Sequence, residues 1–343
     1  MRIRLDPWPI DTLDPQMSLN AFKGDVIDIE SNRWERLARR TIPQNLHTVY
    51  VVDGKPRMEA RLLVENGAAP LFGGYGAYVV GAVELDPHGR REAQLQHVRA
   101  SRILALCGDV KAEGARLIPR NPHTGELLYR VENAEGNTQS APAQKIQSLM
   151  LREEQKLSHA FASQVPWSED DDEEDLAALT LQDGPVRPGF GGGAVVGCVK
   201  TMQTLYVSAD RAYLLSELRP GERSPILYFR YDGSGEARFT WYVRLCDAEF
   251  YQHPYAGVMR LEMHAGDNTE LPNIVRAIAD LSGDLLCKLA SKAHKDPRAP
   301  QNLIPTRALE QAMGRAMGDA SLVMRRIRAH IAQELGQPLG GVA

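Results

Sequence analysis

The sequence lacks the arrangements of cysteine that hold small domains together. Its four cysteines lie far apart and form no Cys-x-x-Cys pair, which excludes a zinc module or a disulfide framework built on such spacing. Cysteines of this kind suit the reducing cytosol, and we therefore expect a cytoplasmic protein. No apolar run reaches the roughly 18 residues needed to cross a bilayer, and the first residues, MRIRLDPWPIDTLDP, contain no apolar signal core. No membrane association is expected.

Several catalytic signatures are also missing. There is no Gly-x-Ser-x-Gly nucleophile motif, no His-Glu-x-x-His zinc motif and no phosphate-binding Gly-x-x-x-x-Gly-Lys-[Ser/Thr] loop. The nine histidines are scattered without the spacing of metal ligands. The net charge is −4, so the whole chain is not a polycation. Binding to a nucleic acid would therefore need a local basic surface or a bridging metal ion.

The hydrophobic pattern predicts a chain that begins with strands and ends with helices. A short helix is expected at 31–41, and a glycine-rich loop, NGAAPLFGGYG, at 66–76. Early strands are expected at 47–53, 58–64, 75–85 and 101–107, and the last one at 257–265. Further helices are expected at 141–162, 271–295 and 304–335. This order is typical of an α/β or α+β fold built on one mixed sheet.

Two of the predicted strands end with the same pair of residues. HTVYVVDG places Asp53 and Gly54 after one apolar run, and LTLQDGPV places Asp183 and Gly184 after another. An Asp-Gly pair alone most often marks a turn. An open sheet, however, presents its reactive groups at strand ends. If the two strands are neighbours, both carboxylates come within reach of one metal ion.

A third acid lies on the helix predicted at 141–162. The apolar residues of this helix recur at three- and four-residue steps, and Glu153 falls on their face between Met150 and Leu157. Glu154 is turned about 100° away, near the edge of that face. A carboxylate in an apolar stripe is costly unless it pairs with a base or binds a metal. Both interpretations stay open, and so does the choice between Glu153 and Glu154.

Three carboxylates at the end of a sheet suit hard divalent cations. Mg²⁺ and Mn²⁺ take oxygen ligands, and such ions activate water for the hydrolysis of phosphodiesters. Taken in order, VVDG, LMLREE, LQDGPV and VVGCVKTMQTLYV resemble the motifs of the NurA family of DNA-repair nucleases. That family has a strand ending in Asp-Gly-Ser, a helix with a Glu after an Arg, a second strand ending in Asp-Gly, and then a Gly-x-x-Lys strand.

The resemblance begins near Thr48 and covers most of the chain. It implies an RNase H-like domain over residues 47–343, in which a mixed β-sheet is flanked by helices and followed by C-terminal helices. Residues 1–46 are then expected to contribute to dimer or partner contacts. Family members form homodimers and work with a hexameric HerA-type ATPase that moves DNA towards them.

The resemblance also implies an activity and its residues. The expected enzyme is a Mn²⁺-dependent deoxyribonuclease, with Mg²⁺ as the alternative ion, that combines 5′–3′ exonuclease and single-strand endonuclease activity. It would process single- and double-stranded DNA ends for homologous recombination. Asp53 and Asp183 correspond to the two metal-binding aspartates, and Glu153 (or Glu154) to the helix glutamate. Lys200 corresponds to a lysine that contacts the scissile phosphate as a point charge.

Two positions depart from the family pattern. Lys55 stands where the family usually has Ser. The family often carries a histidine in a C-terminal helix after Tyr-Pro, whereas the matching stretch here, NLIPTRALEQAMGRAM, contains Pro305 but no histidine. Either another residue does that work, or the histidine is dispensable.

Arginines near the C-terminus form the predicted DNA-binding surface. Arg325 and Arg326 lie in the last predicted helix, and Arg307 lies upstream. Cations at the end of a helix also complement its dipole, which is the competing interpretation. The alternative function is an inactive RNase H-like scaffold that only binds DNA or the ATPase. The intact acids at 53, 153 and 183 argue against it.

Overall fold

The computed structural model describes most of the chain, and all structural statements below concern that part. The described residues are 20–21, 26–31, 33–65, 69–108, 114–123, 125–166, 171–186, 194–200, 204–208, 210–230, 236–265, 270–292 and 300–336. They group into two compact units, and each unit is made of several segments. The first comprises Met1–Val52, Val83–Gln94 and Gln155–Ala308, and the second Asp53–Ala82, Leu95–Glu154 and Leu309–Ala343. The predicted division at residue 47 stays a prediction.

The first unit is built on antiparallel and parallel strands. Its strands, in hydrogen-bonded order, are β2 (Val26–Asp28), β11 (Leu227–Arg230), β12 (Ala237–Arg244), β13 (Val258–Ala265), β9 (Val195–Val199), β8 (Ala178–Asp183) and the first residues of β3 (Thr48–Val64). The ladders are antiparallel from β2 to β9, and parallel between β9 and β8 and between β8 and β3. Two short strands, β1 (Asn20–Ala21) and β10 (Thr204–Leu205), pair separately.

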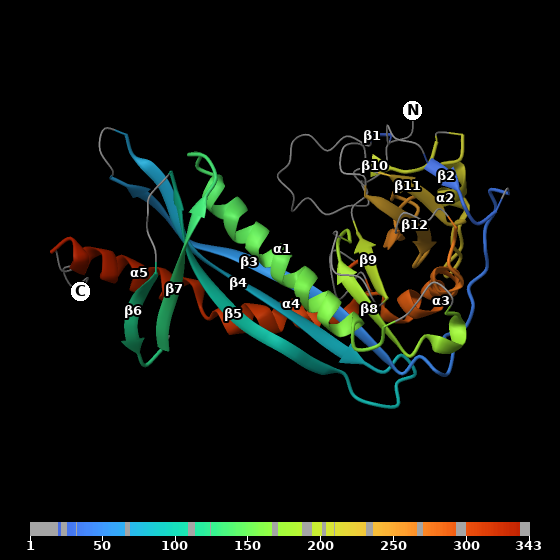
Figure 1. Cartoon of the computed structure of the whole chain (residues 1–343), viewed down its shortest axis with the longest axis horizontal. Coiled ribbons are helices and arrows are strands. Elements are labelled where there is room, and N and C mark those ends of the chain that lie inside the picture. Colours follow the sequence, from blue (N-terminus) through green and yellow to red (C-terminus); the bar gives the residue numbers. More distant parts are fainter. Residues whose placement is uncertain are drawn as a thin grey trace. The chain divides into compact units, whose positions relative to one another are not determined.

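The core of the first unit lies between this sheet and helix α3 (Asn273–Leu289) (Figure 1). The alternation of strand β12 explains why. Phe239 and Trp241 belong to the core cluster that includes residues of α3, and the Trp241 indole N–H donates to Ser282 Oγ at 3.1 Å. Tyr242 points to the opposite face and packs in a second cluster. The alternation of side chains along a strand thus accounts for the burial of Phe239 and Trp241.

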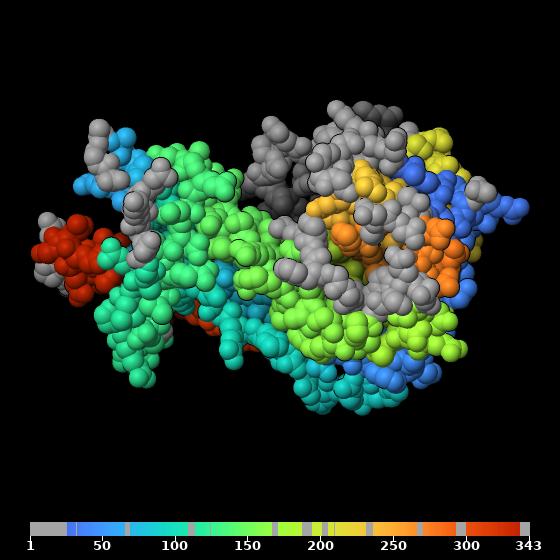
Figure 2. Space-filling view, viewed as in Figure 1, coloured from blue at the N-terminus to red at the C-terminus, as the bar shows by residue number. Residues whose placement is uncertain are grey.

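The second unit continues the strand order with the rest of β3, then β4 (Leu71–Leu85), β5 (Gln94–Cys107), β7 (Gly125–Ala134) and β6 (Ala115–Asn121). The β5–β7 ladder is parallel and the β6–β7 ladder is antiparallel. Figure 2 shows the hairpin formed by β6 and β7 at the surface of this unit, in green-blue. The described strands and helices thus form a mixed α/β fold with a large mixed sheet, flanking helices and C-terminal helices, as predicted.

Helices cover both faces of the strands in the second unit. Helix α1 (Ala141–Ala162) lies against glycines of β4, because a Cβ on Gly74 would lie 3.5 Å from Pro142 Cβ and one on Gly76 would overlap Ile146 Cδ1. Tyr75, between the two glycines, faces the other way and joins a buried cluster with Val323 and other residues of α5 (Ala320–Glu334). Alternate residues of one strand therefore meet different helices.

Four local predictions are corrected. The predicted loop at 66–76 is strand from Leu71 onward, because its glycines give α1 room to approach. The two strands predicted at 47–53 and 58–64 are the single strand β3. Residues 33–41 are not helical. Leu37 exchanges backbone hydrogen bonds with Arg223 as an isolated bridge, and this tertiary pairing overrides helix propensity.

The helix predicted at 304–335 is broken in two. Helix α4 (Ile304–Met317) ends before Gly318, whose φ of +76° suits glycine. Helix α5 then begins with Asp319, which accepts the Leu322 backbone N–H at 2.8 Å as an N-cap. Two shorter helical segments, η1 (Glu173–Asp175) and α2 (Tyr213–Glu217), complete the described elements. None of the described helices is both long and apolar enough to cross a membrane.

Candidate active site

The register between β3 and β8 sets the positions of the two predicted aspartates. The strands run parallel, and Val52 pairs with Gln182. Asp53 directly follows Val52, and Asp183 directly follows Gln182. Each aspartate therefore directly follows a residue of the last pair in the β3–β8 ladder. Strand β8 ends at Asp183, as predicted.

The surroundings of Asp53 differ from the prediction. The sequence indicated a strand end followed by a turn, but β3 continues without interruption to Val64. Asp53 therefore lies within a strand, and its side chain is only 4% exposed. The Gly54 backbone N–H donates to Asp53 Oδ1 at 2.8 Å. Gly54 does not serve a turn here.

Gly54 instead makes room for helix α1. A Cβ at Gly54 would lie 2.9 Å from Met150 Cγ and 3.0 Å from Glu154 Oε2, which are distances that real Cβ atoms hardly ever show. The Glu154 carboxylate therefore lies directly against the backbone of β3 beside Asp53. Two carboxylates of the second unit, from a strand and from a helix, thus border the same glycine.

The buried carboxylate on α1 is Glu154, and the assignment of Glu153 to the buried face was wrong. Glu154 is 3% exposed, whereas Glu153 is only partly buried. The positions that the helix buries follow a four-residue step from Ile146 through Met150 and Glu154 to Ser158. Glu153 lies on the flank of that stripe. The apolar residues at three-residue steps do not distinguish the flank of this stripe from its centre.

The donor chemistry of these residues fits a hard divalent cation. Asp53 and Glu154 offer carboxylate oxygens, which Mg²⁺ and Mn²⁺ prefer, and the missing side chain of Gly54 lets the Glu154 carboxylate approach the strand. Within the described residues, no group of three or more His, Cys, Asp or Glu side chains is placed to hold a metal ion. The fit therefore rests on the donor type and on the two buried acids.

Lys200 and Asp183 form an ion pair in the first unit. Lys200 directly follows β9, and its Nζ lies 2.8 Å from Asp183 Oδ1, with side chains 20% and 26% exposed. The same ammonium donates to Asn302 Oδ1 at 3.0 Å. The sequence did not point to Asn302, because an asparagine ahead of a helix usually indicates only a turn or a cap. Its place at the start of NLIPTRALEQAMGRAM was the one available signal.

Buried charged side chains hydrogen-bond to the backbone of the turn after Asp183. Glu262 Oε1 accepts the Val186 backbone N–H at 2.9 Å, and Arg238 donates to the Val186 carbonyl at 3.0 Å. Glu262 is fully buried and also pairs with Arg260. A Cβ on Gly197 of β9 would lie 2.7 Å from the Gly184 carbonyl oxygen. The backbone that carries Asp183 is therefore fixed on both sides.

Cys198 lies beside this turn but is no nucleophile. Burial, together with the negative charge of Asp183, raises the pKa of the Cys198 thiol to about 12. The thiol therefore stays protonated at neutral pH, and the thiolate is the reactive form. Carboxylates and an ammonium are the groups left for chemistry here.

The family model of the NurA domain matches residues 47–305. The chain belongs to the NurA family. The match begins at the residue before β3 and ends within the first turn of α4, so it includes Asp53, both helix glutamates, Asp183 and Lys200. NurA proteins are nucleases associated with DNA repair, and this protein is accordingly a hydrolase that acts on DNA. Comparison with curated protein sequences gives no match.

The arginines predicted to bind DNA fall into both units of this NurA protein. Arg325 lies exposed on α5, and Arg326 beside it donates to the Pro119 carbonyl oxygen. Arg307 lies partly buried in the first turn of α4. Arg326 thus ties α5 to strand β6, while Arg325 is open to solvent. Their contact with DNA stays a prediction.

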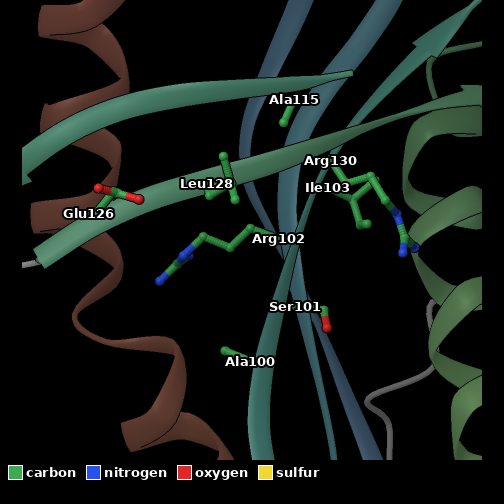
Figure 3. A pocket seen from close by; sticks show the side chains of 8 residues that line it. All are labelled: Ala100, Ser101, Arg102, Ile103, Ala115, Glu126, Leu128 and Arg130. Carbon is green, nitrogen blue, oxygen red and sulfur yellow. The ribbon is translucent and has the colours of Figure 1, made fainter. Parts of the chain in front are cut away.

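A cavity of about 570 Å³ in the second unit does not belong to the NurA site. It is lined by Ala100, Ser101, Arg102, Ile103, Ala115, Glu126, Leu128 and Arg130. Arg102 pairs with Glu59 at 2.5 Å and Arg130 with Glu132 at 2.8 Å. Figure 3 shows the two guanidinium groups pointing away from each other. The cavity lacks the convergent polar groups of a binding site.

Proposed function

We propose that the protein is a Mn²⁺-dependent deoxyribonuclease of RNase H-like type, with Mg²⁺ as a second competent ion. It hydrolyses phosphodiester bonds at DNA ends, as a 5′–3′ exonuclease and as an endonuclease on single strands, during resection for double-strand break repair. One observation carries the proposal. Two buried acids, Asp53 and Glu154, border Gly54 within the NurA match.

In this proposal Asp53 and Glu154 supply oxygen ligands to the metal, with Glu154 in the place predicted for Glu153. Asp183 is proposed as a third ligand from family membership alone. When bound, a divalent ion of this kind activates a water molecule and stabilises charge on the phosphate. The sheet and α1 fix Asp53 and Glu154 by burial, so their carboxylates meet the ion without a costly rearrangement.

Lys200 binds the scissile phosphate in the same proposal. Its ammonium is a compact positive charge held at the end of β9 by Asp183, and its side chain remains 20% exposed. A phosphate oxygen can therefore approach it from solvent. The arginines on α5 and α4, Arg325, Arg326 and Arg307, bind the DNA backbone, where each phosphate contact adds salt-dependent affinity.

An inactive scaffold that only binds DNA or an ATPase is the competing function. It would have no need for carboxylates buried to 4% and 3% exposure beside one glycine, because buried acids destabilise a fold unless something compensates them. A homodimer and a HerA-type hexameric ATPase partner are proposed from family membership alone. Light scattering of the purified protein tests the first, and co-elution with such a hexamer tests the second.

A cleavage assay tests the enzyme directly. Single- and double-stranded DNA labelled at either end is incubated with Mn²⁺, Mg²⁺ or EDTA. Cleavage is expected with Mn²⁺, and it should disappear with EDTA and in Asp53→Asn.

Glu154→Gln and Glu153→Gln form a matched pair of variants. Both remove one charge from neighbouring residues of α1, but only Glu154 is buried against Gly54. We expect at least a tenfold loss of rate in Glu154→Gln, since the loss of a residue that only supports a metal ligand already costs about 10–100-fold, and near-normal rates in Glu153→Gln. The opposite ranking would contradict the assignment of Glu154, and the absence of cleavage in Mn²⁺ would contradict the nuclease.

A further inference from the structure

Lys200 is held by two acceptors from distant parts of the chain. Asp183 Oδ1, at the end of β8, lies 2.8 Å from Nζ, and Asn302 Oδ1, just before α4, accepts from the same ammonium at 3.0 Å. Asn302 is fully buried, although Lys200 is partly exposed. A buried amide therefore contacts a partly exposed charged group at the end of β9, a strand inside the sheet.

We infer that Asn302 is a positioning residue that fixes the ammonium of Lys200 for the transferred phosphate. The inference rests on the proposed function, in which Lys200 binds the scissile phosphate. A lysine side chain has four rotatable bonds and loses much conformational entropy when it is fixed. Two acceptors on different segments define the position of Nζ. The side chain of Lys200 therefore loses its conformational entropy when the protein folds, and not when the transition state of phosphodiester hydrolysis forms.

The chemistry of an amide suits this role better than a second carboxylate would. Asp183 already brings one negative charge to the single positive charge of Lys200. A neutral oxygen adds a hydrogen bond and leaves the net charge of the group unchanged, so the ammonium keeps its attraction for an anionic phosphate. A carboxylate at residue 302 would make the group net negative and repel the phosphate.

The neighbours of Asn302 explain why its amide stays in place. Leu303 is 1% exposed and belongs to the main core cluster of the first unit. Its carbonyl accepts the Arg307 backbone N–H at 3.0 Å, which starts helix α4. Asn302 is thus fixed by the core on one side and leads into a helix. It lies at the start of the stretch that lacks the family's histidine, and it contacts Lys200 from there.

Kinetics of Asn302→Leu test the inference. The substitution keeps the volume and removes the acceptor. With Mn²⁺ and a single-stranded substrate, kcat is expected to fall roughly tenfold, the equivalent of one hydrogen bond to a charged group, while KM changes less than twofold. Gln301→Met is the matched control, because Gln301 is the buried neighbour in the same turn, at 5% exposure, and its kcat should stay within twofold of wild type.

A double mutant separates positioning from a merely structural role. If Asn302 acts through Lys200, Asn302→Leu causes no further loss of kcat in the Lys200→Ala background. An equal tenfold loss in both backgrounds, or a fall in Tm with unchanged kcat, would overturn the inference.

Crystal structures give a readout that does not depend on activity. In Asn302→Leu, Nζ of Lys200 is expected to leave its wild-type position beside Asp183. An unmoved, equally ordered Lys200 would overturn the inference even in an active enzyme. Lack of cleavage by the wild-type protein would refute the proposed nuclease, and the crystal comparison would still decide whether Asn302 positions Lys200.

Discussion

Substitution of Glu59 is predicted to destabilise the protein strongly. The Glu59 side chain is fully buried in the second unit and accepts from Arg57 at 2.7 Å, from Arg102 at 2.5 Å and from the Tyr129 hydroxyl at 2.5 Å. Burial and the charge of Glu59 raise the pKa of Tyr129, so its hydroxyl remains a donor. The carbonyl oxygen of Met317, the last residue of α4, accepts a hydrogen bond from each of the two arginines at 2.8 Å. Glu59 therefore aligns the two cations that cap α4.

The expected size follows from what Glu59→Ala leaves behind. Two largely buried guanidinium groups and one hydroxyl would lose their shared acceptor, and breaking a buried ion pair from one side costs about 3–5 kcal/mol. Glu59→Gln keeps an acceptor oxygen but loses the charge, and should cost about 1.5–3 kcal/mol, the range for hydrogen bonds to charged groups. The two ranges adjoin at about 3 kcal/mol, so Glu59→Ala is expected to be the more destabilising variant.

Glu132→Ala is the matched control. Glu132 pairs with Arg130 at 2.8 Å, but the arginine is 58% exposed and the glutamate 23%. Exposed pairs of this kind contribute about 0–1 kcal/mol. Urea unfolding followed by circular dichroism gives the free energies, with the same m-value required in all variants. A loss in Glu59→Ala no larger than that in Glu132→Ala would refute the argument.

Two further predictions concern acid stability and the glycine beside the site. A side-chain hydrogen bond from Arg90 holds the pKa of Asp86 at about 2. Because this pKa is depressed from 3.8, the contribution of Asp86 to the free energy of unfolding is complete above pH 3.8 and disappears as the pH falls towards 2. The Tm difference between wild type and Asp86→Asn should therefore shrink between these two pH values. A constant difference would contradict the prediction. Gly54→Ala should displace the Glu154 carboxylate and reduce Mn²⁺-dependent cleavage at least tenfold, at an overpacking cost of about 1–3 kcal/mol. Gly76→Ala, which meets Ile146 of the same helix, should cost similar stability in thermal unfolding but retain the cleavage rate of the folded protein; equal rates in both variants would argue against a role for Glu154.

Patterns that depend on the nearest residues were predictable from the sequence. Asp183 ends a buried strand and Lys200 follows the next one, because an apolar run and its polar exit are local signals. The alternation that buries Phe239 and Trp241 is equally local. Such features depend only on the period of a strand.

Features decided by tertiary contact were not predictable. The pair Asp53-Gly54 carries the signal of a turn, yet the approach of α1 makes that glycine part of a straight strand. The choice between Glu153 and Glu154 depended on which edge of a broad apolar stripe meets the sheet. Asn302 reaches Lys200 across a separation of 102 residues, and nothing local to either residue indicates their contact.

The glycines beneath α1 have a consequence for how sequence variation in this protein is interpreted. Gly54, Gly74 and Gly76 each leave a gap that an atom of α1 or a neighbouring strand fills. A side chain at Gly54 or Gly76 would overlap atoms of α1, whereas one at Gly74 would overlap Met58 of β3, and only at Gly54 is an acid of the site among the atoms met. Intolerance to substitution along this row therefore reports the spacing of two layers. If residues were ranked only by how poorly they tolerate substitution, Gly74 and Gly76 would be mistaken for residues that contact DNA.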